Sequence, residues 1–297
     1  MNFYTKANKA FRILSFFIKT ATDGLLFANI WVAFIAAVSV WGVLDWVDIN
    51  NNEAQNYTYF VFFSTLASYN FHYWLPLGAA QAGARAEWQR TNGFFLPVAA
   101  IIGLTCAVYF FIRIYTLWGW ILGLMISTFF YSAPKINCGL FAPLRGKVRA
   151  KTLYLSAHWW LITAFLPLWV WGRLDWSAVY WLIHRAIFIF IIAALFDYKD
   201  REIDAKNQLH NFFKSWSVDN FKLFLQILNF FSCIFILLSY LCHQDICALL
   251  SQLFPLALLQ FIFIQKLNQP NERLYVGLLD ALWAMGFGLY YVLTFSL

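Results

Sequence analysis

The chain has 297 residues, of which 62% are hydrophobic and only 12% charged, and its net charge is +7. Soluble globular proteins have about 45–50% apolar and about 25% charged residues, so this composition excludes a water-soluble fold. The basic residues form short clusters between long uncharged runs, which argues against nucleic acid as a partner and is typical of membrane proteins. We therefore expect a single all-α membrane domain over residues 1–297.

The N-terminal segment, residues 1–23, contains bases among its apolar residues. Lys6, Lys9, Arg12 and Lys19 leave no apolar run long enough for a cleaved signal peptide. Bulky apolar residues between these bases favour a helix that lies on the membrane surface. We expect an interfacial segment that precedes the first spanning helix.

Nine apolar windows follow. A spanning helix needs about 20 largely apolar residues to cross the hydrocarbon core. Uncharged windows of about this length cover residues 24–44, 57–80, 91–112, 114–134, 152–172, 223–244 and 246–265. Two further windows carry one charge each, Arg185 in 176–196 and Asp280 in 274–297. The sequence predicts a bundle of about nine transmembrane helices.

Lysine and arginine concentrate in alternate connections between these windows. The richest clusters lie in the N-terminal segment, in 135–151 and in 199–222. Because cytoplasmic loops carry the excess of basic residues, this alternation predicts a cytoplasmic N-terminus and a C-terminus outside. The predicted location is a bacterial inner membrane. In the predicted outer loop at 242–247, Cys242 and Cys247 leave open either a local disulfide or an ordinary polar turn.

Three aspartates follow the apolar window 176–196. Asp197, Asp200 and Asp204 stand at i, i+3 and i+7, so on a helix they lie within about 60° of one another. Such close carboxylates repel unless a cation lies among them, and oxygen ligands suit Mg²⁺ with a substrate phosphate. One hypothesis is therefore a metal–diphosphate site, and the other is a solvated segment whose acids pair with Lys199, Arg201 and Lys206.

Two charges lie inside the predicted bundle. Arg185 stands about 18 Å deeper along the helix axis than Asp197, and Asp280 about 10 Å inside the last helix. A buried arginine costs at least about 2.5 kcal/mol and is usually functional or paired. These residues either face a common polar cavity, as an ion pair or as substrate-binding groups, or form a pair that only fixes helix packing.

Nine helices and an Asp-x-x-Asp-x-x-x-Asp motif after the sixth resemble the UbiA superfamily of intramembrane prenyltransferases. The resemblance extends over the whole chain and includes Tyr-Ser-Ala-Pro-Lys at 131–135 and the apolar run from Arg185 to Asp197. It implies transfer of an isoprenyl group from an isoprenyl diphosphate to an aromatic or other hydrophobic acceptor. It also implies that Asp197, Asp200 and Asp204 bind Mg²⁺ and act in catalysis. Lys135 and Arg145 would then neutralise the diphosphate.

The first aspartate-rich motif of that family is missing. Asn70 remains at the matching place, but the aspartates are absent, and His72 is the nearest candidate ligand or hydrogen-bond donor. The alternative hypothesis is accordingly a non-catalytic relative that binds a lipid, a quinone-like molecule or a membrane partner. A transporter is a third reading, although the chain shows no internal repeat of the kind such folds contain.

Overall fold

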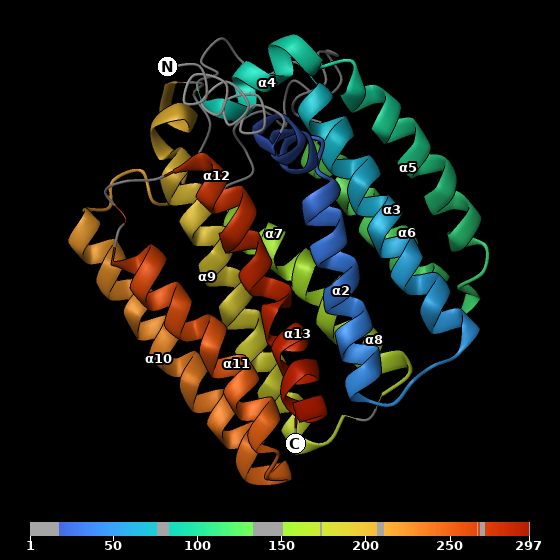
Figure 1. Ribbon diagram of the computed structural model, residues 1–297, viewed down its shortest axis with the longest axis vertical. Helices are drawn as coiled ribbons and strands as arrows, with labels where there is room; N and C mark the ends of the chain where they lie inside the picture. Colours follow the sequence, from blue (N-terminus) through green and yellow to red (C-terminus); the bar gives the residue numbers. More distant parts are fainter. Residues whose placement is uncertain are drawn as a thin grey trace, which may run out of the picture.

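The computed structural model describes residues 18–75, 83–132, 151–172, 174–206, 211–265, 267 and 271–296. Within these residues every regular element is a helix (Figure 1). The all-α prediction is therefore confirmed. Of the predicted N-terminal interfacial segment, residues 1–17 lie outside the described part of the chain.

In its described residues each predicted window is mostly helical, and the windows 24–44 and 91–112 each contain a break between two helices. The first half of the chain contains α2 (Ile30–Trp46), α3 (Asn52–Trp74), α4 (Ala84–Asn92), α5 (Phe95–Phe111), η1 (Tyr115–Leu117) and α6 (Trp118–Ser132). The second half contains α7 (Lys151–Trp160), η4 (Leu161–Phe165), α8 (Leu166–Val170), α9 (Trp176–Lys206), α10 (Val218–His243), α11 (Ile246–Leu258), η5 (Leu259–Ile264), α12 (Glu272–Leu274), η6 (Tyr275–Leu279) and α13 (Asp280–Ser296).

Five helical runs in the described residues are long and apolar enough to cross a membrane. They are Lys151–Val170, Trp176–Lys206, Val218–His243, Ile246–Ile264 and Glu272–Phe295. The number rises to seven if two bent pairs each form one span. Helix α3 does not meet this criterion, and the apolar helix Tyr115–Phe129 is shorter. These helices are compatible with a multi-pass membrane protein, and nine crossings stay a prediction.

The two bends fall inside windows that the sequence predicts as continuous. Ile18–Phe27 meets α2 at 62°, and α4 meets α5 at 85°. The first break lies at Asn29, whose φ of 59° is left-handed. Asparagine is one of the few residues that adopts this conformation at low cost, and a left-handed residue interrupts a right-handed helix.

The ends of α3 have local causes. At its start, the side chain of Asn51 accepts a hydrogen bond from the backbone N–H of Ala54, a typical N-cap. At its end, Leu75 has a ψ of 139° and precedes Pro76. A residue before proline is sterically excluded from the helical region, so α3 ends before the predicted boundary at residue 80.

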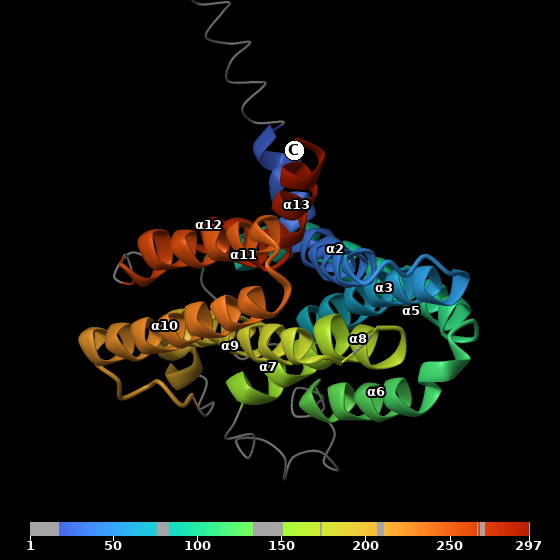
Figure 2. The same cartoon turned by 90° about the horizontal axis from the view of Figure 1, so that it is seen from below.

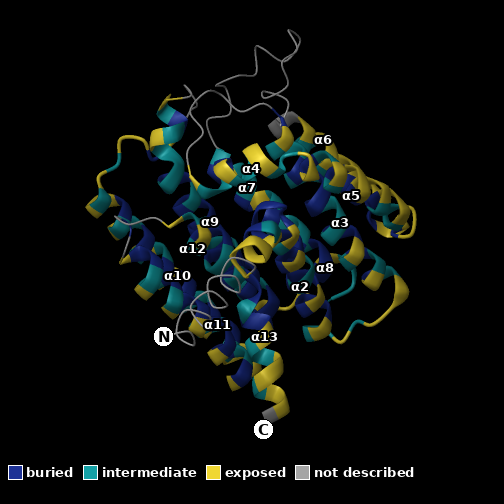
Figure 3. Ribbon diagram, turned by 45° about the horizontal axis from the view of Figure 1, so that its top comes forward, coloured by how far each residue is buried: buried dark blue, intermediate teal, exposed yellow. Residues whose placement is uncertain are grey.

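The helices form one bundle. In two perpendicular views, α10 and α11 lie on one side, α5 and α6 on the other, and α2, α7 and α13 between them (Figures 1 and 2). Helix α9 is buried along most of its length and supplies much of the core. The outer helices α5, α6 and α10 expose large apolar side chains, including Ile101, Leu104, Val108, Leu122, Ile126, Phe230 and Leu241 (Figure 3). Such a surface suits lipid as the solvent.

The two ends of the bundle are named here by the aspartates that lie there. We call the end where α9 finishes and α7 begins the Asp197 end. We call the opposite end, where α9 and α11 begin and α10 finishes, the Asp175 end.

Candidate functional site

Two of the three predicted aspartates are buried together at the Asp197 end. Helix α9 continues ten residues beyond the apolar window, so Asp197 and Asp204 lie two turns apart on one helix face. Each is only 6% exposed. Carboxylates this well buried need partners, because an uncompensated buried charge is costly.

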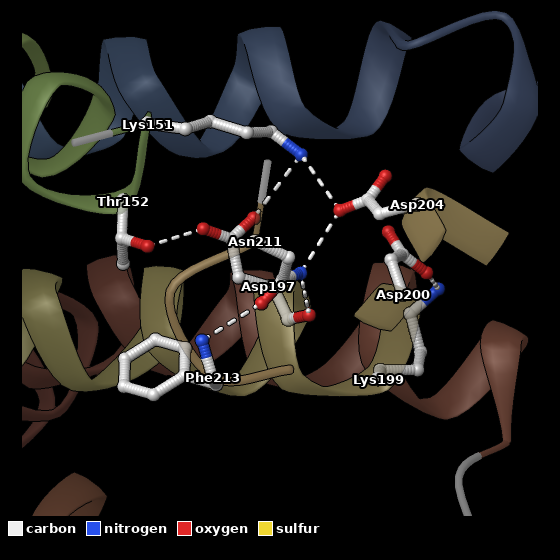
Figure 4. A network of polar contacts seen from close by, with 8 residues as sticks. All are labelled: Lys151, Thr152, Asp197, Lys199, Asp200, Asp204, Asn211 and Phe213. Carbon is white, nitrogen blue, oxygen red and sulfur yellow. Dashed lines mark hydrogen bonds and ion pairs between the residues drawn. The ribbon is translucent and has the colours of Figure 1, made fainter. Parts of the chain in front are cut away.

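Those partners come first from the start of α7. Lys151 Nζ lies 3.2 Å from Asp197 Oδ1 and 3.6 Å from Asp204 Oδ2, so one ammonium group serves both carboxylates. Thr152 Oγ1 donates a hydrogen bond to Asp197 Oδ2. Figure 4 shows these side chains converging on α9 from the neighbouring helix.

Asn211, in the connection after α9, supplies the remaining partner. Its Nδ2 donates to Asp204 Oδ2 at 2.9 Å and to the backbone oxygen of Asp197 at 2.7 Å. Its Oδ1 accepts from the backbone N–H of Phe213 at 3.0 Å. The connection is thereby fixed across both aspartates (Figure 4). Thr152 and Asn211 were not predicted as site residues from the sequence, because neither stands in a charged motif.

Asp200 is not part of this network. It pairs with its neighbour Lys199, with 2.7 Å between Lys199 Nζ and Asp200 Oδ1, and its side chain is 37% exposed (Figure 4). The solvated ion pair that the sequence left open is thus present for this residue. No contact among the described residues draws Asp200 toward the other two aspartates.

This donor set does not fit a magnesium site built from all three aspartates. The ammonium of Lys151 already occupies the place between Asp197 and Asp204 where a cation would bridge them. In the part of the chain that the structure describes, no group of three or more His, Cys, Asp or Glu side chains could hold a metal ion.

Asn70 belongs to a second buried network at the same end. Its Nδ2 donates to the backbone oxygens of Ala28 and Leu66 at 2.9 and 2.8 Å, and its Oδ1 accepts from Asn29 Nδ2 at 3.1 Å. Asn29 Oδ1 in turn accepts from Arg85 Nη1 at 3.0 Å. Asn70 therefore joins α3 to the break before α2.

Arg85 and His72 lie close to aromatic rings beside this network. The Arg85 guanidinium is 4.1 Å from the ring centroid of Tyr73 and 5.5 Å from that of Phe27. The His72 ring meets Tyr73 edge-on at 5.7 Å. Arg85 stands in no recognisable motif, and only its position after the degenerate first motif could have suggested it.

Arg185 and Asp280 are both buried, but they do not form an ion pair. Arg185 is 1% exposed and donates from Nη2 to the backbone oxygen of Trp283 at 3.0 Å, while its Nε has no hydrogen-bond partner. Asp280 is 9% exposed and lies within electrostatic range of Arg85 and Lys199. The structure thus places Asp280 with the groups of the Asp197 end and Arg185 deeper in the bundle.

The remaining predicted positions have simpler outcomes. Lys135 and Arg145 lie outside the described residues. Cys242 and Cys247 are free thiols, one exposed and one buried, so the loop between α10 and α11 contains no disulfide. Asp245 caps α11 by accepting from the backbone N–H of Ala248, which is the ordinary polar turn.

Comparisons with known proteins gave no matching family model, no matching curated protein and no matching solved structure.

Proposed function

We propose that this chain is a UbiA-like membrane protein that binds a lipid or quinone-like amphiphile, or a membrane partner, without metal-dependent prenyl transfer. In this proposal all nine apolar windows cross the membrane, the Asp197 end is cytoplasmic and the C-terminus is outside. The helical segments found within each window support the nine crossings. The alternation of basic clusters supports the orientation.

The position of the Lys151 ammonium carries the proposal. A prenyl transfer enzyme of the resembled family would hold Mg²⁺ among these carboxylates and use it to bind diphosphate. Here Asp197 and Asp204 share the ammonium of Lys151 and are hydrogen-bonded by Thr152 and Asn211. Asn70, the remnant of the first motif, is committed to holding α3 against the chain near Asn29. Both motifs therefore serve packing.

The same end offers cations to an amphiphile's headgroup. Arg85 stacks on Tyr73, and Lys199 Nζ lies 6.0 Å from the rings of both Phe196 and Tyr275. A cation next to aromatic rings at the membrane boundary suits a ligand with a polar head and an apolar tail. An isoprenyl diphosphate or a quinone-like molecule has this chemistry.

The test uses the full chain in nanodiscs, with farnesyl diphosphate and a short-chain ubiquinone as probes. We expect at least one probe to bind with affinities in Mg²⁺ and in EDTA that agree within twofold. Arg85→Gln should weaken that binding about tenfold, which corresponds to about 1.4 kcal/mol. Arg90→Gln, an exposed arginine on the same helix, is the matched control.

The prenyltransferase alternative predicts different results. Binding of farnesyl diphosphate would then require Mg²⁺ and disappear in Asp200→Asn. Addition of an aromatic acceptor would lead to prenyl transfer and release of pyrophosphate from farnesyl diphosphate. Any of these results would overturn the non-catalytic proposal. Failure of both probes to bind would exclude an amphiphile site of this kind. Only the binding of a membrane partner would then remain as the proposed role.

A further inference from the structure

A cavity of about 740 Å³ lies at the Asp175 end, between the ends of α2, α8, α10 and α13 and the starts of α9 and α11. Small-molecule sites usually have volumes of about 300–1,000 Å³. We call it the tryptophan cavity because Trp46, Trp171 and Trp181 line it. It is separated from the Asp197 site by the length of α9, and neither motif discussed above contributes to it.

Aromatic rings form much of its wall. The rings of Trp46 and Trp181 lie 5.1 Å apart, and Phe287 lies 6.0 Å from Trp181 on the other side. Tyr240 and Tyr290 complete this set. The electron-rich faces of such rings, tryptophan above all, attract ammonium groups and form the cages that recognise quaternary amines.

Two carboxylates in the lining are fixed in place. Asp245 accepts from the backbone N–H of Ala248 through Oδ1 at 3.0 Å and from the Tyr290 hydroxyl through Oδ2 at 3.1 Å. Asp175 accepts from the backbone N–H of Ala178 through Oδ1, and its Oδ2 lies 3.2 Å from His243 Nε2. Each carboxylate oxygen has a second lone pair, so both groups can still accept a bond from a ligand.

The described residues of the lining carry acidic groups and no basic side chain other than a histidine. The acidic groups are these two aspartates, and the histidine is His243. The deeper polar groups are occupied, since Ser177 bonds Ser239 and Gln252 bonds His184. The carboxylates near the mouth are therefore the groups that remain for a charged ligand.

Arg185 decides where in the cavity a cation would lie. Its guanidinium is 5.6 Å from the ring centroid of Trp181 and 5.3 Å from that of Phe287, but Arg185 is not in the lining. Its charge disfavours a second cation near the inner rings. A ligand's cation would then lie toward Asp245 and Asp175.

We infer that the tryptophan cavity binds an organic ammonium group, held by Asp245 and Asp175 and enclosed by tryptophan rings. The ammonium could belong to a lipid headgroup, such as phosphatidylethanolamine, or to a free amine such as choline. Both ammonium groups share the attraction to the carboxylates and to the aromatic faces, and the primary ammonium of phosphatidylethanolamine can also donate hydrogen bonds to Asp245 and Asp175. This inference is independent of the proposed function, because it uses no residue of the Asp197 end.

The first arm of the test measures choline binding by calorimetry to the full chain in phosphatidylglycerol nanodiscs, which contain no ammonium lipid. The second arm measures retention of phosphatidylethanolamine over phosphatidylglycerol by native mass spectrometry. We expect saturable binding in at least one arm. Choline binding alone would identify a free amine, and lipid retention alone would identify a headgroup.

Asp245→Asn and Asp175→Asn should each reduce this binding at least tenfold. Asparagine is as good an N-cap as aspartate, so both variants keep the helix starts. The matched control is Asp48→Asn, an exposed carboxylate at the same end outside the cavity. Its φ of 55° is a conformation that asparagine tolerates. The inference is overturned if neither arm shows binding, or if Asp48→Asn weakens binding as much as the cavity variants.

Discussion

Replacing Lys151 by methionine tests most directly whether Lys151 is the cation that pairs with Asp197 and Asp204. The change keeps the apolar stem but removes the ammonium that lies 3.2 Å from Asp197 and 3.6 Å from Asp204. Breaking a fully buried ion pair costs about 3–5 kcal/mol, whereas an exposed pair is worth about 0–1 kcal/mol. The Lys151 side chain is 32% exposed and the side chains of both aspartates, taken without their backbone, are 9% exposed. We therefore expect the free energy of unfolding to fall by about 2 kcal/mol.

The assay is the thermal midpoint of the detergent-solubilised protein, followed by size-exclusion chromatography of its fluorescent fusion. A loss of about 2 kcal/mol lowers Tm by about 4–8 °C in a chain of this size. Lys206→Met is the matched control, because Lys206 is an exposed lysine at the end of α9. It should lower Tm by less than about 2 °C, since surface substitutions usually change stability by less than about 0.5 kcal/mol.

Two additions sharpen this experiment. Asp204→Asn in the Lys151→Met background should restore part of the lost stability, since it removes one uncompensated carboxylate. Mg²⁺ should raise the Tm of Lys151→Met but not of the wild type, because only the variant leaves the space between the carboxylates to a cation. A wild-type Tm for Lys151→Met, or an equal Mg²⁺ response in both proteins, would refute the assignment of Lys151 as the resident cation.

Two further substitutions test the packing and the buried arginine. Gly103→Ala should cost about 1–3 kcal/mol of stability, because the new Cβ would lie 2.8 Å from the backbone nitrogen of Ala67 and 2.9 Å from the backbone oxygen of Phe63. The control is Gly123→Ala, whose Cβ would meet nothing within 4 Å, so this change should be neutral or slightly stabilising. Equal Tm values for the two variants would contradict the close approach of α5 to α3. Arg185→Met should change Tm by less than about 5 °C, because it removes the cost of burying a cation but also removes the hydrogen bond to the Trp283 carbonyl and the contacts with the Trp181 and Phe287 rings. A larger Tm loss would show that these contacts outweigh the cost of burial.

The positions of the helices could be predicted from the sequence because the cause is local. Twenty apolar residues in a row favour a helix in lipid wherever they occur, and every predicted window is mostly helical in the described residues. Several boundaries also have local signals, namely the caps Asn51, Ser217 and Asp245, which a search for N-cap residues would have found. The 62° break at Asn29 has a weaker signal, because asparagine adopts the left-handed conformation readily but does not require it.

The sequence by itself determined an all-α chain with long apolar helices and a row of aspartates at the end of one of them. Only the tertiary structure decided what those aspartates meet, because Thr152 and Asp197 are 45 residues apart and are joined by the packing of α7 against α9. The same holds for Asn29 and Asn70, 41 residues apart, and for the tryptophan cavity, whose walls come from the ends of separate helices. Helix formation depends on neighbours along the chain, whereas these contacts depend on which helix faces meet, and apolar windows carry no information about that choice.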